Sequence, residues 1–335
     1  MDQPLVSIVV VTSDRLVDLR RCLTALHEHT RGPGLPASEI LTVHAPHDHA
    51  AMAMVRHEFP EVTVHVAAAR HISQQRNLGA RMAKGVVLAY IDDDAWPHTG
   101  WLRELTEAFT DPRVVAASGP VRRGDGSFQC ERLMSSPIGR LLPRRSDQPL
   151  TRGFSPSFSG CNLALRRSAL FACGGFDENL SYQPDDMDVC GRLFARVGRD
   201  EAAFRYCPGA VVTHESSPGP YRRTLEDRAW YVVARDNVYY AFRHGGLLRG
   251  AIGGGLLQVP KLLRFGRWLL TGKLGPLAFV RCLGKHVAGT AAGYAKGLLR
   301  PAMLPLRPLP DHAPPPTTGT GEPQESSACR RPQPV

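Results

Sequence analysis

The sequence predicts a doubly wound α/β sheet, and two observations support this prediction. Apolar, β-branched runs alternate with segments of helical spacing, as in proteins whose parallel strands are covered by helices on both faces. The chain has 335 residues, 43% of them hydrophobic and 21% charged, which is the composition of a globular protein with a buried core. This length suits one large α/β domain with an appendage, or two modest domains.

The first half of the chain repeats a strand followed by a helix. Strands are expected at Leu5–Val11, Glu39–Val43, Val62–Ala67 and Val86–Ile91, and helices are expected from Leu16 onward and at Ile72–Lys84. Ligands of such sheets bind beyond the carboxyl ends of the strands. We therefore expect Thr12–Arg15 and Asp92–Asp94 to lie together at one rim of the sheet.

The second half is expected to form shorter elements. Strands are predicted at Val114–Ala117 and Ala210–Thr213, a helix at Met187–Val197, and an irregular, mobile segment at Gly124–Thr151. Residues 1–242 are predicted to form the main domain, with a nucleotide-binding half at 1–110 and an acceptor half at 111–242. A basic helical extension is predicted at 243–310, followed by a Pro-rich disordered tail at 311–335.

Cysteine usage and the N-terminus indicate a cytoplasmic protein. The eight cysteines are scattered and form no CxxC pair, which argues against a zinc site or a disulfide framework. The N-terminal sequence lacks the basic region of a signal peptide, and no run of about 18 uncharged apolar residues predicts a spanning helix.

Three consecutive carboxylates follow an apolar strand directly. Side chains alternate along a strand, so Asp92 and Asp94 should point to one side and Asp93 to the other. Two oxygen ligands on one side suit Mg²⁺ or Mn²⁺ held jointly with substrate phosphates. The alternative is an acidic loop that caps the helix expected to begin near Trp101.

A second acidic group lies at the start of the helix predicted at Met187–Val197. Asp185, Asp186 and Asp188 crowd this helix start, where the helix dipole favours carboxylates. One interpretation is helix capping, with Asp185 or Asp186 at the N-cap. The other is a general base that removes a hydroxyl proton. His214, just past a strand in the same half, is either a surface group or a metal ligand.

These residues belong to five sequence blocks that occur in a characteristic order. The blocks are VSIVVVTSDR, SQQRNLGARMAKGVVLAYIDDDAWP, SGCNLALRRSALFACGGFDENL, PDDMDVCGRL and VVTHESS. Together they resemble a family 2 glycosyltransferase of the GT-A fold over roughly residues 5–242. The resemblance implies transfer of a sugar from a nucleotide-diphosphate donor to a hydroxyl acceptor, with inversion and with a divalent cation, Mg²⁺ or Mn²⁺.

The resemblance also implies roles for individual residues. Asp92 and Asp94 resemble the DxD pair that binds the cation and the donor, and His214 resembles a residue that completes the cation site. On the donor side, it implies that Thr12, Asp14, Arg15, Arg76, Asn77 and Asp93 lie near the nucleotide. On the acceptor side, it implies that Asp186 is the catalytic base beside Asp185, and that Gly160 and Asn162 form the floor where donor sugar and acceptor meet.

One position departs from the family pattern. Members usually carry an Asp pair after the second strand that reads the nucleobase, whereas this chain has Val43-His44-Ala45-Pro46. A uridine, thymidine or guanosine donor therefore remains open, as does a hexosyl or deoxyhexosyl group. The acceptor is equally open among a glycan, a lipid-linked molecule and a small molecule, in glycoconjugate, cell-envelope polysaccharide or natural-product biosynthesis.

Two other functions are weighed against sugar transfer. A sugar-phosphate nucleotidyltransferase would need a Gly-rich basic loop after the first strand, which TSDRLVDL does not provide. The other is a sugar-nucleotide-binding or lipid-binding protein with a degenerate site, which the intact Asp92, Asp94, Asp186 and His214 argue against. Nucleic-acid binding is not expected, because no recognition motif accompanies the basic charge.

The basic charge is confined to the C-terminal part. Residues 1–242 hold 28 basic and 28 acidic residues, whereas residues 243–300 hold ten basic residues and no acidic one. On a helical wheel Lys261, Arg264 and Arg267 lie on one side, Trp268 near the boundary, and the other side gathers Leu262, Leu263, Phe265, Leu269 and Leu270. This pattern predicts peripheral contact with the inner face of the cell membrane, or else packing on the main domain.

Overall fold

The computed structural model describes residues 5–32, 34–130, 132–144, 150–181, 184–215 and 230–299, together with Met303 and Leu306. The disordered tail predicted at 311–335 lies outside the described residues.

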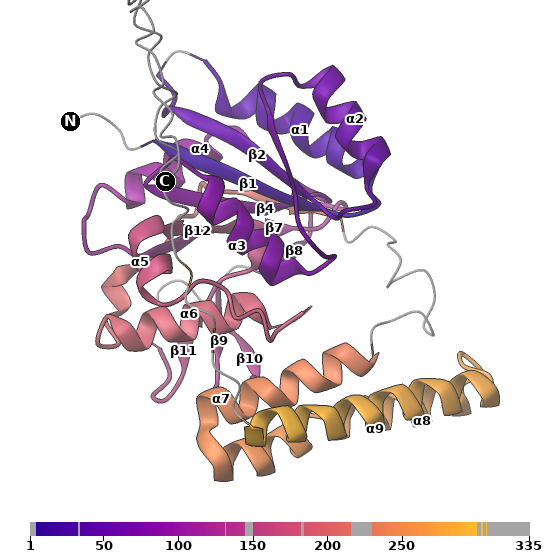
Figure 1. Ribbon diagram of the computed structural model, residues 1–335. Helices are drawn as coiled ribbons and strands as arrows, with labels where there is room; N and C mark the ends of the chain where they lie inside the picture. Colours follow the sequence, from indigo (N-terminus) through magenta and orange to yellow (C-terminus); the bar gives the residue numbers. More distant parts are fainter. Residues whose placement is uncertain are drawn as a thin grey trace, which may run out of the picture.

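The described residues build a mixed sheet of seven strands, which confirms the α/β prediction (Figure 1). Its order is β13-β6-β12-β4-β1-β2-β3, with bounds Phe204–Tyr206, Ala116–Ser118, Leu163–Arg166, Val87–Asp92, Val6–Thr12, Ser38–His44 and Thr63–Val66. Neighbouring strands from β4 to β3 run parallel, and β12 runs antiparallel to both β4 and β6. All seven residues of β1 are buried, as its continuous apolar sequence predicts.

Helices cover both faces of this sheet. One core cluster joins β1 to α1 (Leu16–Thr30), α2 (His49–Glu58) and α4 (Trp101–Ala108). The other joins the opposite face of β1 to α3 (Ile72–Met82), α5 (Arg167–Ala172) and α6 (Asp185–Arg196). The alternating valines of β1 explain the two faces, because Val10 enters the first cluster while Val9 and Val11 enter the second.

Two small sheets flank the main one. The first has the order β5-β14-β7-β8, with bounds Ala95–Pro97, Val212–His214, Val121–Arg122 and Phe128–Cys130. The second has the order β10-β9-β11, with bounds Leu141–Arg144, Arg132–Ser135 and Ser155–Ser157. Short 3₁₀ turns η1 (Gly160–Asn162) and η2 (Glu201–Ala203) precede β12 and β13.

Several sequence expectations need correction. The segment Gly124–Thr151 is not irregular throughout, because it contains β8, β9 and β10. These strands are only three or four residues long and form local hairpins, β7 with β8 and β9 with β10, so each is too short to show a strand pattern. Helix α2 and strand β12 were not predicted. The predicted strand ends at Val114–Ala117 and Ala210–Thr213 shift by one or two residues, and α6 begins two residues before Met187.

The C-terminal helices form a layer beside the sheets (Figure 1). They are α7 (Trp230–Leu256), α8 (Val259–Leu270) and α9 (Pro276–Leu299), and α7 is broken at Gly246, whose φ is 74°. Helix α7 thus begins before residue 243 and continues past it. None of the helices in the described ranges combines the length and the hydropathy needed to cross a membrane.

Close packing joins α9 to α7. A Cβ at Gly289 would lie 2.1 Å from the carbonyl oxygen of Tyr231, and one at Gly293 would lie 2.6 Å from the carbonyl oxygen of Arg235. The absent side chains let the two backbones approach. Phe265 of α8 is buried and packs edge-on against Trp230, with ring centroids 4.7 Å apart. The helical wheel placed Phe265 on the apolar side of α8, for which both membrane contact and packing on the main domain were open. The structure buries Phe265 against α7.

Candidate active site

The ends of β1 and β4 meet at one rim, as predicted. Val11 pairs with Asp92 in the parallel register of these strands. Asp93 is buried and accepts hydrogen bonds from Thr12 Oγ1 at 2.8 Å and from Arg15 Nη1 at 2.9 Å. Burial, with Asp94 beside it, raises the pKa of Asp93 to about 7 against the opposing influence of Arg15. Asp93 therefore fastens the β1 loop to the β4 end.

Asp94 lies between a guanidinium and an imidazole. Its Oδ2 is 2.6 Å from Arg15 Nη1, and its Oδ1 is 3.1 Å from His214 Nε2. The small sheet brings His214 to this place, because His214 pairs with Ala95 in the register of β14 and β5. Burial alone would lower the pKa of His214, but the hydrogen bond with Asp94 raises it to about 11.

Asp92, Asp94 and His214 form a potential cation site. Their ligand atoms all lie within 4.8 Å of one another, and the Asp92 side chain is 26% exposed. Carboxylate oxygens suit Mg²⁺ and Mn²⁺, and one imidazole is compatible with the latter. The donor set therefore fits a divalent cation. Strand β4 ends at Asp92, so Asp93 and Asp94 lie in the turn after it. Both contact Arg15 Nη1 instead of pointing to opposite sides as strand alternation predicts.

Asp14 lies at the outer edge of the same rim. It adopts a positive φ of 58°, and its Oδ2 is 3.2 Å from Arg70 Nη1 and 3.3 Å from His47 Nε2. Aspartate tolerates this left-handed backbone better than most residues. Asp48, the first acid after β2, is buried and bonds to His44 Nδ1 at 3.1 Å. The carboxylate nearest in sequence to the family's base-reading position is thus engaged inside the fold.

Arg76 of α3 connects the two acidic groups. Its Nη1 lies 2.6 Å from Asp185 Oδ2, and its Nη2 lies 3.2 Å from Asp92 Oδ1. The guanidinium is buried, and these carboxylates keep it charged. Burial raises the pKa of Asp185 to about 7 even though Arg76 opposes the shift. Gly160 makes room for this pair, because a Cβ there would lie 2.4 Å from Arg76 Nη2.

Asp186 is the more open carboxylate at the start of α6. It is half-buried, whereas Asp185 is 3% exposed. Its two oxygens accept backbone N–H bonds from Gly160 at 2.9 Å and from Met187 at 2.7 Å. Burial raises the pKa of Asp186 despite Arg76 nearby. The capping interpretation is wrong, because Pro184 occupies the N-cap and both aspartates lie in the first turn.

Two expected site residues serve the surrounding structure. Asn77 donates to the Phe176 carbonyl and to Glu178, each at 2.9 Å, and accepts from the Phe176 N–H at 2.8 Å. Asn162 is fully buried; it accepts from Trp101 Nε1 and donates to the Ala210 carbonyl. Both amides hold the loops that carry the site, whereas Gly160 reaches Asp186 and Arg76 directly.

Asp188 links the site to α7, which the sequence did not reveal. It is fully buried and lies 2.6 Å from Arg192 Nη2, 2.9 Å from His244 Nε2 and 3.3 Å from Arg243 Nε. Burial alone would raise the pKa of Asp188, but Arg192 and His244 hold it well below its usual range. The helix that carries Asp186 is therefore anchored to α7. No local motif marks the contact with α7, since Arg243 and His244 are 55 and 56 residues from Asp188 in sequence.

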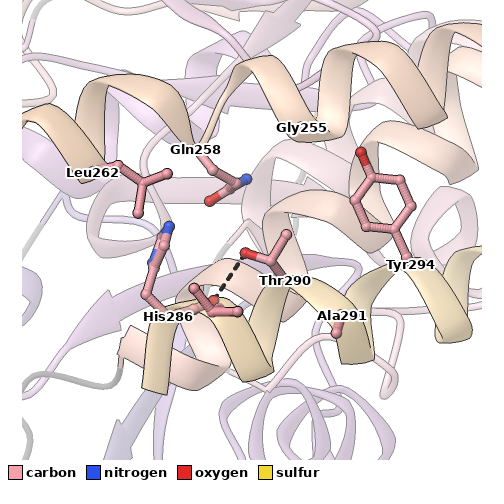
Figure 2. A pocket seen from close by; sticks show the side chains of 8 residues that line it. Gly255, Gln258, Leu262, His286, Thr290, Ala291 and Tyr294 are labelled. Carbon is pink, nitrogen blue, oxygen red and sulfur yellow. Dashed lines mark hydrogen bonds between the residues drawn. The ribbon is translucent and has the colours of Figure 1, made fainter. Parts of the chain in front are cut away.

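A hollow of about 320 Å³ lies elsewhere, among the C-terminal helices (Figure 2). It is lined by Gly255, Gln258, Leu262, His286, Val287, Thr290, Ala291 and Tyr294. None of the candidate active-site residues described in this subsection lines the hollow.

Comparison with known proteins relates the chain to glycosyltransferases. Residues 7–171 match the family model described as Glycosyl transferase family 2. Pre-mycofactocin glycosyltransferase of Mycobacterium tuberculosis is 29% identical over 221 residues, which make up 64% of this chain and 44% of that relative. The chain thus spans less than half the length of this relative.

Two solved structures share the fold. Mannosyltransferase PcManGT from Pyrobaculum calidifontis, in complex with GDP-Man and Mn²⁺, aligns with a TM-score of 0.51 and 17% identity over 89% of this chain and 88% of that chain. GalNAc-T7 with UDP, GalNAc and Mn²⁺ aligns with a TM-score of 0.51 and 16% identity over 71% of this chain and 50% of that chain. These likenesses confirm the expected GT-A fold.

Proposed function

From the premise that the chain belongs to the family 2 glycosyltransferases, we propose that it moves a sugar from a nucleotide-diphosphate donor to a hydroxyl acceptor with inversion at the anomeric carbon. The observation that carries this proposal is the position of Arg76. One buried guanidinium contacts Asp92, at the end of the donor-side strand, and Asp185, which precedes the open carboxylate of Asp186. Both acidic groups therefore face one site.

The donor side is formed by β1, β4 and β14. We assign the nucleotide to the rim formed by Thr12, Asp14 and Arg15, with Asp92 and Asp93 beside it. Asp94 and His214, together with Asp92, would hold Mg²⁺ or Mn²⁺. When bound, the cation would offset the negative charge that develops on the departing nucleoside diphosphate. Arg15 adds a fixed positive charge next to this position.

The acceptor side is formed by Asp186. Its carboxylate is half-buried, and two backbone N–H groups fix its orientation, so it can receive a proton from an acceptor hydroxyl. The acceptor oxygen would then form the new bond to the anomeric carbon as the bond to the nucleoside diphosphate breaks. One carboxylate suffices for this direct displacement, because no covalent sugar intermediate is needed.

The ligands of the similar solved structures support a nucleotide-diphosphate sugar as the donor. The two solved structures hold UDP with GalNAc and GDP-Man, and both contain Mn²⁺. We accordingly propose a nucleotide-diphosphate hexose or deoxyhexose for this chain. The mycobacterial relative is named for pre-mycofactocin. For this chain, we propose that the acceptor hydroxyl belongs to a glycan, a lipid-linked molecule or a small molecule. The pathway would be that of a glycoconjugate, an envelope polysaccharide or a natural product.

Calorimetric titration of a nucleotide-sugar panel tests the proposal. We expect the purified chain to bind one donor in the presence of Mn²⁺, to bind it at least tenfold more weakly after chelation, and to lose it in Asp94→Ala. Asp125→Ala is the matched control, because Asp125 lies in an exposed turn and its hydrogen bonds within the described part of the chain go to neighbouring Ser127. Binding that is absent across the panel, or unaffected by Mn²⁺ and by Asp94→Ala, would favour a degenerate binding protein.

A further inference from the structure

Helix α9 presents an apolar face along its whole length. Its exposed large side chains include Leu277, Val280, Val287 and Leu298, each more than half exposed. They recur at helical spacing, and exposed alanines at 288, 291 and 295 fill the positions between them. A water-soluble helix normally directs such a stripe into a core, whereas α9 directs its glycine stripe toward α7 and leaves this one outside.

Exposed apolar side chains continue onto the neighbouring helices. On α7 they are Leu248, Ile252 and Leu256, which follow one another at intervals of four residues. On α8 they include Leu263, which is 70% exposed, and Leu270, which is 88% exposed. So many exposed large apolar side chains on three packed helices are uncommon on a soluble monomer and point to an interaction site.

The hollow in Figure 2 opens between these helices. Gly255 and Gln258 line it from the α7–α8 junction, Leu262 from α8, and Val287 and Ala291 from the apolar face of α9. The exposed apolar side chains of α8 and α9 therefore meet at one concave place.

Two uncharged polar side chains, His286 and Gln258, lie buried behind the largely apolar lining of the hollow. Within the described residues, neither ring nitrogen of His286 has a hydrogen-bond partner, and the same is true of Gln258 Oε1. His286 is 1% exposed, and burial, with Lys261 nearby, lowers its pKa to about 4, so the ring is neutral near pH 7. Buried polar atoms without partners are costly, so an occupant that offers a carbonyl or hydroxyl beside hydrocarbon would fit.

Positive charge surrounds this apolar surface. Exposed basic residues of the three helices are Arg249, Arg264, Arg267, Arg281 and Lys285, and Lys273 is exposed in the turn between α8 and α9. Residues 243–299 contain no acidic residue. A second copy of the chain would bring the same sign of charge to the contact. An anionic lipid surface would bring the opposite sign together with apolar material.

We propose that α7–α9 bind the surface of an anionic lipid bilayer, with a lipid's ester and adjoining hydrocarbon entering the hollow above His286. The apolar side chains of α8 and α9 enter the acyl region, and the surrounding arginines and lysines contact headgroup phosphates. Because Asp188 fastens α6 to α7, this contact holds the catalytic helix close to the bilayer. The inference stands independently of the proposed transfer reaction.

Co-sedimentation of the full chain with vesicles tests the surface. We expect binding to vesicles of phosphatidylcholine with about one-third phosphatidylglycerol, weak binding to phosphatidylcholine alone, and release as salt is raised. Arg264→Gln with Arg267→Gln should weaken partitioning by about 30-fold, since each basic residue contributes roughly fivefold. The control pair Arg56→Gln with Arg103→Gln, exposed on α2 and α4, should leave it unchanged.

Apolar variants complete the test. Leu277→Ser with Val280→Ser should lower partitioning at least tenfold, while Val17→Ser, 73% exposed on α1, should not. Ala291→Phe should fill the hollow and lower partitioning severalfold with the chain still folded. Equal binding of all variants, equal binding to neutral vesicles, or a lipid-free dimer that Val280→Ser dissociates would overturn the proposal.

Discussion

The guanidinium of Arg76 lies 2.6 Å from the carboxylate of Asp185, although the two residues are 109 positions apart in the chain. Both groups are buried, and Arg76 extends its second amino group to Asp92. A buried charge is stable only when its partners are well placed. This ion pair therefore fixes the distance between the donor-side strand end and the helix that carries Asp186.

The first prediction concerns that ion pair. Arg76→Lys keeps the charge but removes the planar fork that reaches two carboxylates at once. We expect unfolding free energy to fall by about 2 kcal/mol, the value of a hydrogen bond to a charged group, and kcat/KM to fall with it. Thermal unfolding and donor turnover measure the two effects. Arg20→Lys alters an exposed pair with Glu58, and a comparable loss there would contradict a special role for Arg76.

A second prediction concerns the space beside Arg76. Gly160→Ala places a Cβ 2.4 Å from Nη2 of a side chain that two ion pairs hold in place. We expect the guanidinium to shift and turnover to drop at least tenfold, with the chain still folded by circular dichroism. Gly266→Ala is the matched control, because its Cβ meets nothing within 4 Å, and it should raise stability by up to about 1 kcal/mol. Unchanged turnover in Gly160→Ala would show that the pair tolerates displacement.

The third prediction concerns the base. Asp186→Asn keeps the shape of the side chain and one of its two backbone hydrogen bonds, because its amide NH2 cannot accept an N–H, and it cannot accept the hydroxyl proton. We expect kcat to fall about 10²–10⁴-fold while the donor dissociation constant changes little, as measured by a turnover assay and by calorimetry. Asp125→Asn serves as the control in an exposed turn. Normal transfer by Asp186→Asn would assign the base to another residue.

A fourth prediction follows from the same carboxylate. Burial raises the pKa of Asp186 above the ordinary aspartate value of 3.8. The base works only when ionised, so kcat/KM should be maximal at high pH and should fall as pH drops through the raised pKa. A pH–rate profile at saturating cation measures this limb. A profile that stays flat down to about pH 4 would mean that no carboxylate with a raised pKa controls the reaction.

The extent of sequence prediction differs between elements. Local patterns predict the buried strands β1 and β4 and the acidic residues after β4. An apolar run and its end can be recognised without knowing which elements pack against it. Roles that depend on contacts with residues distant in sequence could not be predicted from local patterns. Asn77 and Asn162 sit in family blocks, yet their amides bond to backbone groups 48 to 99 residues away.

The same reasoning explains the errors outside the main sheet. Strands β8 to β10 are only three or four residues long, so the alternation of their side chains is too brief to mark them as strands. The helical wheel of α8 located an apolar side but could not tell packing from exposure. Phe265 is buried against Trp230, while Leu270 is 88% exposed. A helical wheel describes one helix in isolation, whereas the burial of a side chain depends on the element that packs against it.

The most direct test of the cation and donor site is anomalous diffraction from crystals grown with Mn²⁺ and a nucleoside diphosphate. The geometry predicts one manganese peak within coordination distance of Asp92, Asp94 and His214, with the diphosphate against it and the nucleoside along Thr12–Arg15. A manganese peak at another place, or a nucleotide bound away from the β4 end, would contradict the assignment of this rim as the donor site.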